Sequence, residues 1–258
     1  MFQIKRILFP VDFSDRCRGA AAYVEALAGR FEAELILLHV IEATYNTALD
    51  DLQIPPGKFD EFFGDDLNCF RVTRRVEHGE AARKIVECAS AHHVDLIMIP
   101  TQGMGIYRRL ILGSTSAKVL HDADCPVWTG VHLEDAPRLD ALASRRILCA
   151  VDLGVSSGTV LDWAQHLAEE YQADLTLLHV TENPEARSAL EELKNTVGSH
   201  ATVRLESGEP SKIVPYIAAQ LSADLLVIGR KAEAGIFGRL EATAYSIIRQ
   251  SPCPVISV

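Results

Sequence analysis

The sequence predicts an α/β fold built from two tandem domains, each with an open parallel sheet. The chain repeats itself, because "RILFPVDFS" from Arg6 returns as "RILCAVDLG" from Arg146, and "AELILLHV" from Ala33 returns as "ADLTLLHV" from Ala173. Within each copy, short apolar runs alternate with longer amphipathic stretches. This alternation is typical of βαβ units, in which helices cover both faces of a parallel sheet.

The spacing of the two copies changes along the chain. The step from Arg6 to Arg146 is 140 residues, whereas "VDLIMIP" from Val94 returns as "ADLLVIG" from Ala223 after only 129. The first copy therefore contains about eleven extra residues, which we place within 43–68, "ATYNTALDDLQIPPGKFDEFFGDDLN". The role of this extra segment stays open.

Each predicted strand of the first copy is a mostly apolar run of about four to eight residues. These runs lie near residues 4–11, 34–41, 70–77, 94–100 and 125–131. Helices are expected near 15–30, 80–92 and 114–122. Either Ser14 or Asp15 could cap the first helix, whose expected buried face comprises Ala21, Val24, Leu27, Ala28 and Phe31.

The second copy follows the same plan, with helices near 156–171, 184–197, 210–221 and 242–250. We divide the chain into a domain of residues 1–131, a polar linker of residues 132–144 and a domain of residues 145–258. The terminal strands, 125–131 and 253–258, are edge strands that need partners. We expect them to pair the two copies into an internal pseudo-dimer; whether two chains form a homodimer stays open.

Composition narrows the class of protein. The net charge of −10 disfavours binding to nucleic acid or to anionic membranes, and no apolar run is long enough to span a bilayer. The six cysteines form no C-x-x-C pair and lie in or beside apolar segments, as reduced buried thiols do. No signal peptide is visible. We expect a cytoplasmic protein with neither nucleic acid nor membrane as partner.

Parallel strands present ligand-binding residues at their carboxyl ends, where the strand order reverses. In the first copy these ends carry Pro10, Val11, Asp12, His39, Val40, Ile99 and Pro100. The carboxylate of Asp12 could accept hydrogen bonds from adenine or ribose, or it could cap the following helix. Its recurrence as Asp152 does not decide between the two, because a cap would recur as well.

The stretch "IPTQGMGIYRRLILGSTSAKVL", residues 99–120, places glycines before a predicted helix. Gly103, Gly105 and Gly113 allow positive φ and close approach of a ligand to the backbone, and Ser114 and Thr115 open a helix whose free amides attract anions. A phosphate site and a simple turn both fit this pattern, and no Walker sequence is present.

These residues resemble the universal stress protein family. The matching segments are "ILFPVD", "LILLHV", "CPVW" and "PTQGMGIYRRLILGS", the last fitting the family pattern G-x-x-G-x(9)-G-[ST] with Pro100 in place of the first glycine. The resemblance implies a Rossmann-like fold, also like that of the adenine nucleotide alpha-hydrolases. It further implies a stress-response or regulatory protein that binds ATP, and "CPVW" corresponds to the strand through which family members pair.

The resemblance also implies roles for particular residues. Asp12 and Val40, with Val11 beside them, would contact adenine or ribose, whereas Gly103, Gly113, Ser114 and Thr115 would hold the phosphates. A divalent cation such as Mg²⁺ or Mn²⁺ can accompany a triphosphate, but no carboxylate pair identifies its ligands. The corresponding site of the second copy comprises Asp152, Val180, Gly229 and Thr243. Ala232 and Ala242 replace its glycines, so we expect it to be weakened or closed.

Two other functions compete with nucleotide binding. A pure interaction module would keep the fold and lose the ligand, which Pro100 and the missing glycines of the second copy favour. An enzyme, such as a slow ATPase, would need a placed base or nucleophile. We find no H-E-x-x-H or S-G-G-x-D-S pattern, and we predict no catalytic residue and no metal ligand.

Overall fold

The computed structural model describes residues 2–42, 54–55, 57–64, 67, 71–101, 112–130, 145–230 and 242–258. By their contacts, Met1–Gln102 and Leu112–Trp128 belong to one compact unit and Ala143–Val258 to another. Each copy of the repeat thus has a folded body of its own. The predicted linker, residues 132–144, lies outside the described residues, so the proposed domain boundaries stay predictions.

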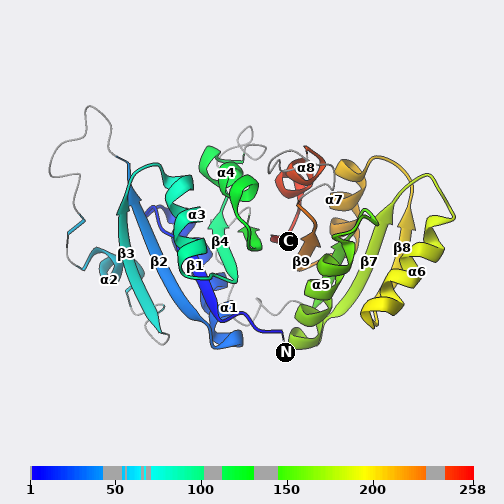
Figure 1. Ribbon diagram of the computed structural model, residues 1–258, viewed down its shortest axis with the longest axis horizontal. Helices are drawn as coiled ribbons and strands as arrows, with labels where there is room; N and C mark the ends of the chain where they lie inside the picture. Colours follow the sequence, from blue (N-terminus) through cyan, green and yellow to red (C-terminus); the bar gives the residue numbers. More distant parts are fainter. Residues whose placement is uncertain are drawn as a thin grey trace. The chain divides into compact units, whose positions relative to one another are not determined.

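The first copy is a parallel sheet with helices on its faces (Figure 1). Its elements are β1 (Arg6–Pro10), α1 (Asp15–Phe31), β2 (Glu34–Ile41), α2 (Lys58–Phe63), β3 (Val72–His78), α3 (Ala81–Ala91), β4 (Leu96–Pro100), α4 (Ser114–Asp122) and β5 (Val127–Gly130). The strand order is β3-β2-β1-β4-β5, and β1 pairs in parallel with both β2 and β4. The order therefore reverses between β1 and β4.

The second copy repeats this arrangement. Its elements are β6 (Arg146–Ala150), α5 (Ser157–Tyr171), β7 (Asp174–Val180), α6 (Ala186–Val197), β8 (Thr202–Glu206), α7 (Pro210–Gln220), β9 (Leu225–Ile228), α8 (Ala242–Gln250) and β10 (Val255–Ser257). The strand order is β8-β7-β6-β9-β10, with the reversal between β6 and β9. The predicted α/β fold of two open parallel-sheet repeats is confirmed. The pairing of the copies through their terminal strands stays a prediction.

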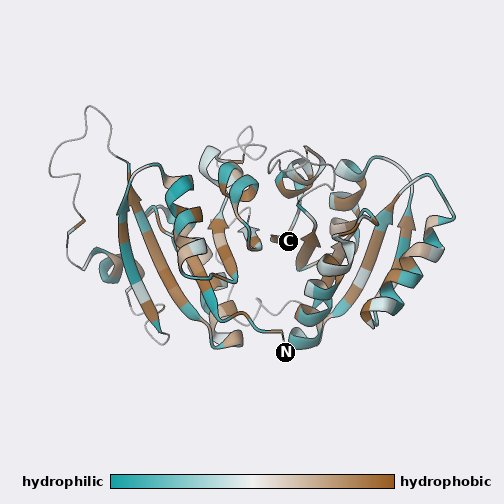
Figure 2. Cartoon of the chain, in the orientation of Figure 1, coloured by the Kyte–Doolittle hydropathy of each residue, from teal (hydrophilic) through white to brown (hydrophobic). Residues whose placement is uncertain are grey.

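The central strands are buried because helices cover both sides of each sheet, whereas β3 and β8 have no fully buried residue. Ile7, Leu8 and Phe9 of β1 have no exposed surface, and Figure 2 shows hydrophobic strands beneath helices that turn hydrophilic residues outward. Ser14 caps α1 by accepting a hydrogen bond from the Cys17 amide, and the predicted apolar face of this helix is buried. No described helix has the length and apolar character that a membrane crossing requires.

Most of the described cysteine side chains are buried as well. Each cysteine in the described part of the chain is free, and all but Cys125 are buried. This agrees with the expectation of reduced buried thiols, although Cys69 lies outside the described residues. Burial raises the pKa of Cys253 to about 11, so this thiol stays protonated at neutral pH.

Helix α2 was not predicted from the sequence. At six residues it is too short to show a helical period, and an isolated helix of this length would not be stable. Its side chains supply the stability instead: Phe59 and Phe63 are buried, with ring centroids 5.2 Å from Phe13 and 6.2 Å from Phe9, respectively. The extra segment of the first copy is therefore partly built into its core.

Replacing Phe9 tests this account of the core. Phe9→Ala should lower the free energy of unfolding by roughly 3–5 kcal/mol, the usual cost of removing a buried aromatic side chain. Urea denaturation would measure the change. The matched control is Tyr216→Ala, since Tyr216 is 62% exposed, and its effect should stay within about 0.5 kcal/mol. Equal effects of the two substitutions would contradict the assignment.

Candidate functional site

A cavity of about 330 Å³ lies at the carboxyl ends of β1, β2 and β4. Every site residue predicted for the first copy that the structure describes lines it: Pro10, Val11, Asp12, Val40, Ile99, Pro100, Gly113, Ser114 and Thr115. Gly103 lies outside the described residues. The fold thus brings residues from three strand ends and from the start of α4 around one space, as expected from the reversal of strand order.

Further lining residues were missed or left without a role in the sequence analysis. They are Arg16, Cys17, Leu38, His39, Glu42, Ala81, Ile85 and Ser116. Arg16 and Cys17 stand four and five residues after Asp12, in the first turn of α1. Because Asp12 lies before the N-cap Ser14, helical spacing alone does not predict these contacts, and the sequence carried no clear signal for them.

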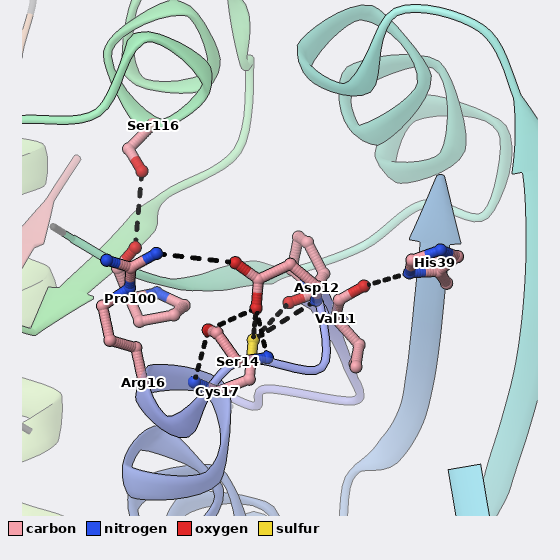
Figure 3. A network of polar contacts seen from close by, with 9 residues as sticks. Val11, Asp12, Ser14, Arg16, Cys17, His39, Pro100 and Ser116 are labelled. Carbon is pink, nitrogen blue, oxygen red and sulfur yellow. Dashed lines mark hydrogen bonds and ion pairs between the residues drawn. The ribbon is translucent and has the colours of Figure 1, made fainter. Parts of the chain in front are cut away.

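Asp12 connects the end of β1 to the start of α1 (Figure 3). Its Oδ1 accepts hydrogen bonds from the amide and the hydroxyl of Ser14 and from the thiol of Cys17, the amide at 2.9 Å and the thiol at 3.0 Å. Its Oδ2 lies 3.9 Å from Nη2 of Arg16. The two interpretations of Asp12 are therefore compatible: one oxygen holds the turn, and the carboxylate also lines the cavity.

These contacts determine the protonation states of Asp12 and Cys17. Burial alone would raise the pKa of Asp12, but the hydrogen bonds from Cys17 and Ser14 and the charge of Arg16 bring it below its ordinary value. Burial, together with the neighbouring carboxylate, raises the pKa of Cys17 to about 12. At neutral pH the carboxylate is ionised, and the thiol is the hydrogen-bond donor.

His39 closes the neighbouring part of the cavity at the end of β2. Its Nδ1 lies 2.6 Å from the carbonyl oxygen of Val11, so Nδ1 carries the proton and Nε2 is an acceptor (Figure 3). Burial lowers the pKa of His39, with Lys58 acting in the same direction. The ring is thus neutral at pH 7, and its contacts make His39 a hydrogen-bonded residue of the cavity wall.

The start of α4 forms another part of the cavity. Gly113 is its N-cap, with φ −58° and ψ 149° and no side-chain capping bond. The first intrahelical bond runs from the Ala117 amide to the Gly113 carbonyl at 2.9 Å, so the amides before Ala117 lack intrahelical acceptors. Of the two properties that glycine allows, positive φ is therefore not used at Gly113. What glycine provides here is the absence of a side chain beside the cavity.

A second cavity, of about 290 Å³, occupies the equivalent place in the second copy. It is lined by all the residues predicted for that site: Asp152, Val180, Gly229 and Thr243. Ala242 begins α8 and so has a helical backbone, in which alanine bears no left-handed strain. The expected strain therefore does not arise there, and the described residues leave this cavity open. Ala232 lies outside them.

The sequence model of the universal stress protein family matches residues 3–129, 143–199 and 184–258. The chain belongs to the universal stress protein family. A universal stress protein of Mycolicibacterium smegmatis is 24% identical over 295 residues, which cover 98% of this chain and 96% of that protein. The predicted family resemblance is confirmed.

Two further comparisons concern about half of the chain and the whole fold, respectively. The "universal stress protein in QAH/OAS sulfhydrylase 3′ region" of Thermus aquaticus is 30% identical over 143 residues, 48% of this chain and 96% of its own. The crystal structure of a universal stress protein from Archaeoglobus fulgidus superposes with a TM-score of 0.83 at 23% identity, covering 99% of this chain and 98% of that one. The latter supports the fold alone.

Substituting Cys17 tests the carboxylate–thiol pair. Cys17→Ala should raise the pKa of Asp12, because a hydrogen bond to the ionised form is lost while its burial remains. Cys17→Ser should keep it low, since serine also donates. A pH titration of the Asp12 carboxyl by NMR would measure both.

The same titration fixes the sign of the effect on stability. The folded-state pKa of Asp12 is lowered from 3.8, so its ionised form stabilises the fold above that pH, and this contribution is lost as the pH falls through the folded-state value. In Cys17→Ala the loss should begin at higher pH. An unchanged pKa in Cys17→Ala would show that the thiol does not support the carboxylate.

Proposed function

We propose that this chain is a stress-response or regulatory protein that binds ATP, or another adenine nucleotide, in the cavity of its first copy. One observation carries the proposal. The residues implied by the family motif, which come from distant parts of the sequence, surround a single cavity of about 330 Å³. This volume is at the lower end of the range for small-molecule sites, roughly 300–1,000 Å³.

The two ends of the cavity suit the two ends of a nucleotide. Val11, Asp12 and Val40 offer apolar surface and a carboxylate, which can accept hydrogen bonds from ribose hydroxyls. At the other end, Ser114 and Thr115 begin α4, and unpaired amides at a helix start bind phosphate oxygens. Gly113 leaves room for that approach. Arg16, which also lines the cavity, adds a positive charge.

We propose that the chain catalyses at most slow ATP hydrolysis. Two of the ionisable groups described around the cavity are poor general bases or nucleophiles. The lowered pKa of Asp12 makes it a weak base, and the Cys17 thiol, with its pKa raised to about 12, is protonated. His39, whose Nδ1 is bonded to Val11, keeps Nε2 as an acceptor, and it is the described group on which slow hydrolysis would depend. Binding, rather than chemistry, is what most of these groups support.

A divalent cation would depend mainly on the nucleotide for its ligands. No group of three or more histidine, cysteine, aspartate or glutamate side chains with metal-site geometry occurs in the described part of the chain. Mg²⁺ commonly binds through substrate phosphates and water with only one or two protein carboxylates. We therefore propose that Mg²⁺ or Mn²⁺ enters only together with ATP.

The competing proposal is an interaction module without nucleotide. Pro100, at the end of β4, lacks an amide donor where the family motif has glycine. In either case we propose a cytoplasmic protein whose partners are its own second copy and, in a homodimer, a second chain, with neither nucleic acid nor membrane.

Calorimetric titration with ATP, ADP and AMP separates the two proposals. We expect saturable binding of ATP in the first copy and a loss of roughly two orders of magnitude in affinity in Gly113→Val, since each lost hydrogen bond to a charged group costs about 1.5–3 kcal/mol. Ala242→Val, the equivalent change in the second copy, is the matched control and should leave this binding intact. Absence of ATP binding by the folded wild-type protein would favour the interaction module.

The rate of phosphate release from ATP tests separately whether the protein is a catalyst. With ATP and Mg²⁺, the protein should release phosphate at most slowly, and no faster in Cys17→Ser than in the wild type. Rapid turnover at tens per second, ordinary for an enzyme, would contradict a binding role.

A further inference from the structure

We propose that the cavity of the second copy binds an uncharged ribonucleoside rather than a nucleotide. The inference rests on the lining of that cavity alone, and it holds whether or not the first copy binds ATP. The two cavities share one end and differ at the other. The shared end recognises hydrogen-bond donors, and the altered end has lost the features that favour phosphate.

The shared end is the turn after the first strand of each copy. In the second copy, Oδ1 of Asp152 accepts hydrogen bonds from the Gly154 amide at 2.8 Å and the Ser157 hydroxyl at 2.9 Å. Ser157 takes the place that Cys17 has in the first copy, and it bonds the same carboxylate oxygen. Within the described residues nothing donates to Oδ2 of Asp152, so this oxygen is available to a ligand hydroxyl.

A second acceptor lies beside this carboxylate. Nδ1 of His179 is 2.8 Å from the carbonyl oxygen of Val151, which matches the bond between His39 and Val11. The proton on Nδ1 leaves Nε2 as an acceptor. Asp152 and His179 both line the cavity. Two neighbouring acceptors suit the hydroxyl and amino donors of a ribonucleoside.

Among the described lining residues, the second cavity lacks the positive charge that the first has. Ser156 replaces Arg16 at the equivalent place, and among the described lining residues of the second cavity Asp152 is the only charged group. Within the described lining, a phosphate would thus meet a carboxylate without the cation that Arg16 supplies in the first cavity. Ala242 and Ala244 replace Gly113 and Thr115, so one hydroxyl donor is lost and a methyl group stands where the first copy has none. These changes disfavour an anion more than a neutral ligand.

The rest of the cavity suits a flat, apolar ring. Its described walls come from β6, β7, β9 and three helices and are mostly aliphatic: Val151, Val160, Leu178, Val180, Val214, Ile228 and Ile247. Small-molecule sites generally combine such walls with a few placed polar groups. At about 290 Å³ the cavity is slightly smaller than the first. Adenosine has a planar base, neutral charge and hydroxyl donors, so it is the natural probe.

The test measures adenosine binding to the full chain in the presence of saturating ATP. One equivalent of adenosine should bind. Asp152→Asn should weaken it by at least about tenfold, because an acceptor becomes an amide donor while the carbonyl oxygen still holds the turn. Asp174→Asn, the same change at an exposed aspartate of the second copy that lines neither described cavity, should leave this binding unchanged. ATP titrated alone reports on the first copy separately, so failure of either proposal is distinguishable.

Installing the missing cation gives a second, gain-of-function test. Ser156→Arg should raise the affinity of the second cavity for AMP relative to adenosine by about tenfold, the effect of a new charge-assisted hydrogen bond. Circular dichroism would verify that each variant is folded. The proposal is overturned if adenosine fails to bind the ATP-saturated protein, if Asp174→Asn weakens that binding as much as Asp152→Asn does, or if the wild-type second cavity binds AMP as tightly as adenosine.

Discussion

The reversal of strand order next to the first strand of each copy is the constraint on which the rest of this structure depends. Chain connections leave β1 toward β2 on one side, whereas β4 lies on its other side, so the loops above the sheet diverge. The same divergence occurs between β6 and β9. This divergence leaves a crevice above the sheet. Backbone carbonyls, turn residues and a helix start line it. Both cavities occupy this position.

Periodicity and repetition were enough to predict most of the fold. The bounds of β2, α4 and α8 agree with the sequence-based expectation, because long apolar runs and a clear alternation of element types leave few alternatives. Helix α2 could not be found this way. Its stability comes from rings contributed by the β1–α1 turn and by β1, so only tertiary contacts explain it.

The residues at the strand ends of the candidate site could be predicted from the topology. The contacts between their side chains could not. Strand ends converge whatever their side chains, so Asp12, Val40 and Pro100 could be placed together in advance. The thiol of Cys17 could not be assigned to Asp12, because the apolar segment that follows it indicated only burial. For Gly113, the residue type allowed both a left-handed backbone and close approach of a ligand, and the structure uses only the space that glycine leaves. A residue type limits what a position can do, but the backbone decides which of its properties is used.

Each cavity is enclosed by strands and helices of its own copy. A gene duplication that yields two such self-sufficient halves removes the selective penalty on change in either one, since a substitution such as arginine to serine beside one carboxylate leaves the other untouched. The halves can then drift apart in chemistry while the scaffold stays the same. Sequence identity between them is therefore a poor guide to whether they still share a ligand.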